Sequence, residues 1–138
     1  MKIHELMEST VRSLVGLTVD GVTFPQQTFG TSLRVPSRGL TSLEGSPSRV
    51  AGDFNCDDNL LKSLEGGPKS VSGNYRCAGN LLVTLDGGPE FVRDVFNCRE
   101  NRLTSLKGAV KEVSSFNCNN NHLTSLEGAP STITSGDF

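Results

Sequence analysis

Apolar and polar positions recur along this chain with a period of about twenty residues. The clearest unit, Phe-Asn-Cys-Asp-Asp-Asn-Leu-Leu over residues 54–61, returns in altered form at 75–82, 96–103 and 116–123. The cysteines at 56, 77, 98 and 118 are therefore 21, 21 and 20 residues apart. A fixed period of this size predicts a solenoid, in which each repeat buries its apolar face by stacking on its neighbours.

Each repeat places apolar residues where they can build a continuous core. The aromatic residue and the cysteine lie two positions apart, the spacing that puts both side chains on one side of a strand. The aromatic line consists of Phe54, Tyr75, Phe96, Phe116 and Phe138, and the two leucine lines consist of Leu40, Leu61, Leu82, Leu103 and Leu123, and of Leu43, Leu64, Leu85, Leu106 and Leu126. We expect all three lines to point inward, with the aromatic residue and the cysteine on one short strand per coil and the leucines after that strand has ended.

Polar and turn-forming residues recur with the same period. An asparagine follows each cysteine by three positions, at Asn59, Asn80, Asn101 and Asn121. An inward asparagine can bond the backbone of adjacent coils, which predicts a ladder of side-chain amides. Gly-x-Pro then reverses the chain, because glycine allows positive φ and proline presets the next bend. A coil of about 20 residues leaves no room for a full helix, so we expect an extended or 3₁₀-like return, beginning at Val50, Val71, Val92, Val113 and Ile133.

The first 28 residues do not follow the repeat. Apolar residues in 1–15 recur at steps of three and four, which predicts a helix. Residues 17–24 alternate around Asp20-Gly21 and predict strand, turn and strand. We expect residues 1–28 to form an N-terminal helix-and-hairpin cap. Residues 29–138 then form the solenoid, with a degenerate first repeat in which Leu33 replaces the aromatic residue, four clear repeats and an incomplete last one.

The unit Phe-x-Cys-x-x-Asn-x-Leu-x-x-Leu resembles the core of a leucine-rich repeat. The period of 20–21 residues and the phrase Leu-Thr-Ser-Leu-Glu-Gly-x-Pro are similar to the short repeats of leucine-rich-repeat proteins from tailed bacteriophages and bacteria. The resemblance covers about residues 29–138. It implies a leucine-rich-repeat solenoid (α+β, mostly β), with short parallel strands on one face and an N-terminal helical cap. It also implies a phage or bacterial protein that acts in a reducing cytoplasm, that of the host cell if a phage encodes it.

Composition narrows the possible partners. The formal net charge of −2 and the pI of about 5.6 do not indicate a general nucleic-acid or anionic-membrane surface. The chain has no run of 18 apolar residues, and its charged N-terminus lacks the apolar core of a secretion signal. We therefore expect neither nucleic acid nor membrane as a partner.

Few residues offer reactive chemistry. Four cysteines could form two disulfides, but each holds the same inward place in its repeat, which favours a line of buried free thiols. Zinc would need ligands converging on one point, and repeats place thiols in a line. Asp57-Asp58 could be catalytic or calcium-binding, but the acidic pair does not recur in later coils, which favours a solvated surface. We expect no catalytic activity, metal or cofactor.

The outward residues of the strands are the candidate binding site. They change from coil to coil while the inward positions hardly vary, and a rigid curved sheet presents side chains at a low entropic cost. The candidate residues are Asp53, Asn55, Asp57, Asn74, Arg76, Asn97, Arg99, Asn117 and Asn119. We expect a non-catalytic module that binds a partner protein, such as a host factor, through this face. The simpler alternative is a solvated polar face without a partner.

The sequence stops at Phe138, inside an expected strand and without a C-terminal capping repeat. This predicts an open apolar end and an unpaired strand edge, which soluble proteins usually cover. Either a second copy pairs there through Ile133 and Phe138, giving a homodimer, or the natural chain continues. The alternative function is therefore that of a structural or assembly protein that self-associates.

Overall fold

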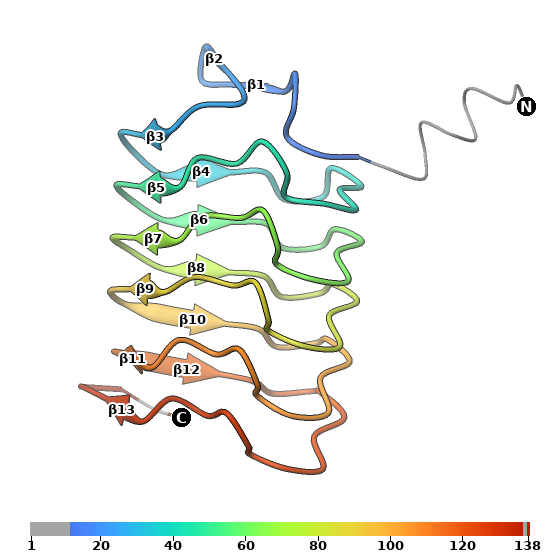
Figure 1. Ribbon diagram of the computed structural model, residues 1–138, viewed down its shortest axis with the longest axis vertical. Coiled ribbons are helices and arrows are strands. Elements are labelled where there is room, and N and C mark those ends of the chain that lie inside the picture. The colour runs from blue at the N-terminus through green and yellow to red at the C-terminus, as the bar shows by residue number, and fades with distance from the viewer. Residues whose placement is uncertain (1–11, 137) are drawn as a thin grey trace, which may run out of the picture.

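The computed structural model describes residues 12–136 and residue 138. The chain winds into a β-solenoid of about five coils, each contributing one strand to either side (Figure 1). None of these described residues is helical, so none belongs to a helix long and apolar enough to cross a membrane. The period found in the sequence is thus the period of the fold.

Five parallel strands form one side of the solenoid, which we call the front sheet. They are β4 (Leu33–Arg34), β6 (Phe54–Asn55), β8 (Tyr75–Arg76), β10 (Val95–Asn97) and β12 (Ser115–Asn117). They pair in chain order, and the register puts Leu33 beside Phe54, and Phe54 beside Tyr75. The predicted strand of each coil, and the place of Leu33 in a degenerate first repeat, are confirmed.

The return segments are extended, as expected, but they also pair as a second set of strands, which the sequence did not predict. They are β3 (Thr28–Phe29), β5 (Arg49–Val50), β7 (Ser70–Val71), β9 (Phe91–Val92), β11 (Glu112–Val113) and β13 (Thr132–Ile133). One parallel sheet consists of β3, β5, β7 and β9. β11 pairs only with β13. The ladder therefore breaks between β9 and β11, next to the corner where the fourth coil is one residue shorter.

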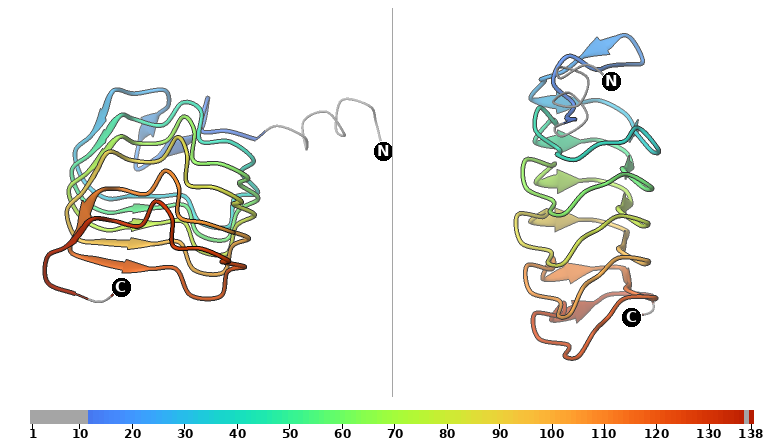
Figure 2. Two further views of the ribbon diagram at one scale, coloured as in Figure 1. Left: turned by 60° about the horizontal axis from the view of Figure 1, so that its bottom comes forward. Right: turned by 90° about the vertical axis from the view of Figure 1, so that its right-hand side faces the viewer.

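The core runs the length of the solenoid inside the coils. Figure 2 shows how these coils stack along the axis. Aromatic rings form a column in which successive ring centroids, from Phe54 through Tyr75, Phe96 and Phe116 to Phe138, lie 5.1, 5.1, 5.3 and 5.6 Å apart. The leucine lines are buried through Leu103 and Leu106, as expected. The prediction is wrong for Leu126, which is 58% exposed because no described coil packs beyond it.

The predicted asparagine ladder is confirmed, and it has a direction. Asn80 Nδ2 donates to the carbonyl oxygen of Cys56 in the preceding coil at 3.1 Å, and to Cys77 and Ala78 in its own coil. Its Oδ1 accepts from the amide of Leu61, again in the preceding coil, at 3.0 Å. The other three inward asparagines, Asn59, Asn101 and Asn121, repeat this pattern. Each asparagine therefore completes the turn of the coil before it.

A hairpin covers the first coil (Figure 1). β1 (Thr18–Val19) and β2 (Val22–Thr23) are antiparallel around Asp20 and Gly21, whose φ angles of 50° and 78° suit a tight two-residue turn. The predicted strand, turn and strand are confirmed. The helix expected over residues 1–15 lies mostly outside the described residues. Residues 12–15 are not helical, so the helical cap is not supported, and buried Leu14 and Phe24 cover the core instead.

Candidate functional site: the strand face

The strand face is the outward side of the front sheet together with the residues that follow each strand. Its central column consists of the registered positions Arg34, Asn55, Arg76, Asn97 and Asn117. A second column precedes the inward aromatic line and contains Asp53 and Asn74, and a third follows the cysteines and contains Asp57, Arg99 and Asn119. The fold therefore places all nine predicted positions in these three columns, and all but Asp57 are at least partly exposed.

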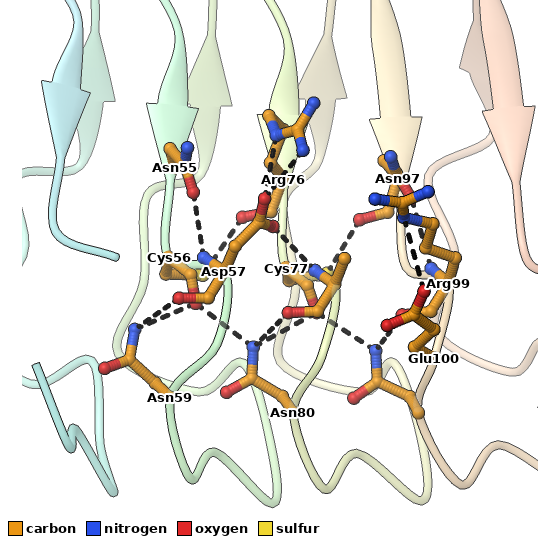
Figure 3. A network of polar contacts seen from close by, with 12 residues as sticks. Asn55, Cys56, Asp57, Asn59, Arg76, Cys77, Asn80, Asn97, Arg99 and Glu100 are labelled. Atoms are coloured by element: carbon orange, nitrogen blue, oxygen red, sulfur yellow. Dashed lines mark hydrogen bonds and ion pairs between the residues drawn. The ribbon is translucent and has the colours of Figure 1, made fainter. Parts of the chain in front are cut away.

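The asparagines of the central column are held by their own coils. Asn55 Oδ1 accepts the amide of Asp57 at 2.8 Å, and Asn97 and Asn117 accept the amides two residues ahead at 3.2 and 3.0 Å (Figure 3). Asparagine commonly makes this two-residue turn, which fixes the side-chain orientation. These side chains are therefore preorganised on the sheet.

The column that contains Asp53 and Asn74 has a structural role that the sequence reasoning missed. Ser32 Oγ accepts the amide of Asp53, Asp53 Oδ1 accepts that of Asn74, and Asn74 Oδ1 accepts that of Val95, all at 2.8–3.0 Å. Each side chain thus binds the backbone of the next coil. The recurrence of Ser, Asp and Asn, three short oxygen-bearing residues, at one repeat position was the available signal.

Asp57 is the clearest departure from expectation, because it is only 7% exposed. Its Oδ1 accepts the amide of Ala78 at 2.8 Å, and its Oδ2 lies 2.9 Å from Nε and 2.8 Å from Nη2 of Arg76 (Figure 3). Both residues were predicted to face a partner. Asp57 instead binds the next coil, and Arg76 neutralises it while remaining partly exposed. The prediction that Asp57 points into solvent is therefore wrong.

An open part of the face lies beside the fourth and fifth front strands, β10 and β12, which Arg99 and Asn119 follow. Arg99 and Asn119 are exposed, and Arg99 Nε lies 4.0 Å from Glu100 Oε1, with both side chains about half exposed. Exposed ion pairs of this length contribute little to stability. These residues can therefore be replaced with little effect on the fold.

The residues predicted for self-association lie at the other end from the hairpin (Figure 1). Phe138 stacks on Phe116 and is 51% exposed, while Ile133 is partly buried against the core. A cavity of about 250 Å³ lies between Phe138 and the strand face, lined also by Val95, Ser115, Phe116, Asn117 and Asn119. Exposed Leu126 adds to the apolar surface of this last coil.

The cysteines are free thiols, as predicted, and they are buried at positions 56, 77 and 98. The Sγ atom of Cys56 donates to the carbonyl of Arg76 in the next coil at 3.3 Å, and Cys77 and Cys98 repeat this contact. Burial raises the pKa of these three thiols well above its usual range. Within residues 12–136 and at 138, no three His, Cys, Asp or Glu side chains gather as metal ligands would.

Comparison with known proteins found no relative of this chain. No protein-family model, curated protein or solved structure matches the chain. Its function must therefore be argued from its own geometry.

Proposed function

We propose that this protein is a non-catalytic interaction module that binds a partner protein through the strand face. The supporting observation is the preorganised central column, in which Asn55, Asn97 and Asn117 are fixed by backbone hydrogen bonds. Side chains that are already ordered lose little entropy when a partner binds. The face also varies in charge from coil to coil, which allows one partner to be distinguished from another.

The finer assignment, also a proposal, is a leucine-rich-repeat protein of a tailed bacteriophage or bacterium. Its support is the repeat unit itself, with asparagine and leucine at fixed places in every coil. In this proposal the module works in a reducing cytoplasm, where its thiols remain free, and engages a host protein. Fold alone does not determine function, so this step rests on the sequence resemblance.

The test is affinity capture from a bacterial lysate, using wild type and Arg99→Glu/Asn119→Asp. These two residues are exposed, whereas Arg76→Glu would leave Asp57 buried without its partner and confuse the result. The control, Lys111→Glu/Ser131→Asp, makes the same charge change at exposed positions on the return side. We expect a specific protein to be captured by wild type and by the control, but not by the strand-face variant. Equal capture by all three would contradict the proposal.

Self-association is the second candidate function. It is favoured by exposed Leu126 and Phe138, which lie with Ile133 at one end of the solenoid. Light scattering over a tenfold concentration range would then give about twice the 14.7 kDa chain mass, and Phe138→Asp would reduce the mass to that of a monomer. A constant monomer mass for wild type would exclude this function.

A further inference from the structure

We infer that the partner site on the strand face is a row of hydrogen-bond donors that recognises an acidic, acceptor-rich protein segment. The row is the central column, Arg34, Asn55, Arg76, Asn97 and Asn117. This inference rests on the proposed function and names the chemistry of the partner.

The three asparagines present donors because their oxygens are already engaged. The amide of Asp57 can only donate, so the atom of Asn55 that faces it must be the oxygen, and Nδ2 must point away from the turn (Figure 3). The same contact orients Asn97 and Asn117. None of the three Nδ2 groups has an acceptor in the part of the chain that the structure describes. Each therefore offers N–H groups to the outside.

The two arginines of the column add further donors. Arg34 and Arg76 retain 60% and 41% of their side-chain exposure, and a guanidinium carries five N–H donors and no acceptor. The carboxylates that adjoin the column already have partners on the sheet. Asp57 is engaged with Arg76 and with the amide of Ala78, and Asp53 binds the amide of Asn74 and lies 3.7 Å from Arg34. The whole column consequently presents donors.

Spacing makes these donors a linear site. Adjacent strands lie about 4.8 Å apart, so five positions span about 19 Å along the solenoid axis. A ligand that satisfies them must offer acceptors at comparable intervals over that length. Carboxylates are the best acceptors among protein side chains, and their hydrogen bonds to arginine are stronger than neutral ones. An extended run of Glu or Asp in a partner protein fits both requirements.

The decisive variant reverses the donors without changing the shape of the column. Asn55→Asp/Asn97→Asp/Asn117→Asp keeps an oxygen for each turn amide, because aspartate makes the same turn, and replaces each outward Nδ2 by an oxygen. The matched control is Gln27→Glu/Ser72→Asp/Thr134→Asp, which adds the same charge at exposed residues on the return side. Single Asn97→Asp provides a milder version of the same reversal.

The probe is fluorescein-labelled octaglutamate, which spans about 26 Å when extended. Its binding is measured by fluorescence anisotropy at low ionic strength. We expect wild type and the control to bind with dissociation constants within about twofold of each other, and the triple asparagine variant to bind at least about tenfold more weakly. Asn97→Asp should fall between them. Circular dichroism and thermal unfolding establish that every variant tested is folded.

Three results would overturn the inference. They are failure of wild type to bind octaglutamate, unchanged binding by the folded asparagine variants, and binding of oligothymidine of matched length at least as tightly and with the same variant dependence. The last result would assign the row to phosphates. The two experiments can also disagree. If wild type captures a protein from lysate, Arg99→Glu/Asn119→Asp loses that capture, and wild type does not bind octaglutamate, the acidic partner is rejected and the proposed function is kept. Failure of both experiments would reject both.

Discussion

The buried asparagines carry much of the specificity of this fold at the scale of single residues. Asn80 makes three donor contacts and one acceptor contact with backbone groups, and it is 5% exposed. Removing it would leave those backbone groups without partners in the core, which is the costly way to lose a hydrogen bond. A single residue of this kind therefore stabilises two coils.

We predict that Asn80→Ala lowers the free energy of unfolding by about 3 kcal/mol or more. Urea titration monitored by circular dichroism measures this change. Asn119→Ala is the control, because that side chain is exposed and has no side-chain hydrogen bond among the described residues, and it should change stability by about 0.5 kcal/mol or less. Similar losses for the two variants would contradict the structural role assigned to the ladder.

Tyr75 is an exception within the aromatic column. Its hydroxyl is buried without a hydrogen-bond partner among the described residues, and burying such a group unpaired is unfavourable. We predict that Tyr75→Phe raises the free energy of unfolding by about 1 kcal/mol. The reverse change, Phe96→Tyr, should lower it. Destabilisation by Tyr75→Phe would mean that the hydroxyl makes a contact in solution.

The buried thiols predict a loss of stability in alkali. Cysteine thiols in the unfolded chain have a pKa of about 8.5. In the folded protein, burial raises the pKa of Cys56, Cys77 and Cys98. A raised folded pKa gives stability that is fully present below the unfolded pKa and is lost as the pH rises above it. The urea midpoint should therefore fall between about pH 8 and 9.5. The fall should be shallower in Cys56→Ala/Cys98→Ala, and an equal fall would assign it to other groups.

At the scale of elements, tight contact between turns depends on glycine. Gly87 has a φ of 80°, and a Cβ atom there would lie 2.9 Å from Cα of Glu65 in the preceding coil. We predict that Gly87→Ala costs about 2 kcal/mol or more, because it combines an unfavourable φ with a clash against backbone. Gly30→Ala is the control, since nothing lies within 4 Å of its Cβ and its φ is not positive. Thermal unfolding of both variants measures the difference.

The elements differ in how readily the sequence predicts them. The front strands were predictable because Phe54 and Cys56 alternate with polar residues and recur in each coil, and the hairpin was predictable from Asp20-Gly21. The pairing of the return strands was not predictable, because it depends on neighbours about 21 residues away in the sequence. The sequence had indicated only an extended or 3₁₀-like return there.

The candidate site shows the same limit. Strand spacing was enough to place Asn55, Asn97 and Asn117 on the strand face. The burial of Asp57 was not predictable, because it depends on Arg76 and Ala78 in the next coil, and neither contact leaves a repeated pattern. The break between β9 and β11 had visible signs, the short fourth coil and Val110 in place of proline, but not a predictable geometry.

At the scale of the whole molecule, a solenoid has contacts only between neighbours, so stability should vary along its axis. We predict that the amides of Phe54 and Cys77, which donate to the next coil, are among the slowest to exchange with deuterium. The amides of Lys111 and Glu112, at the break in the return ladder, should exchange faster than those of Lys69 and Ser70 in the unbroken part. Hydrogen exchange followed by NMR tests this order, and uniform protection would indicate one cooperative unit.

The direction of the asparagine ladder has a consequence for how the protein is made. Because Asn80 serves Leu61 and Asn101 serves Leu82, a coil stays unfinished until the following coil arrives. A ribosome delivers the chain in that same order, with the hairpin that covers the first coil emerging early. The solenoid can therefore form one coil at a time during synthesis. Each new coil supplies the asparagine that pairs the backbone of the coil before it, so that the most recently made coil is the one that still lacks this partner.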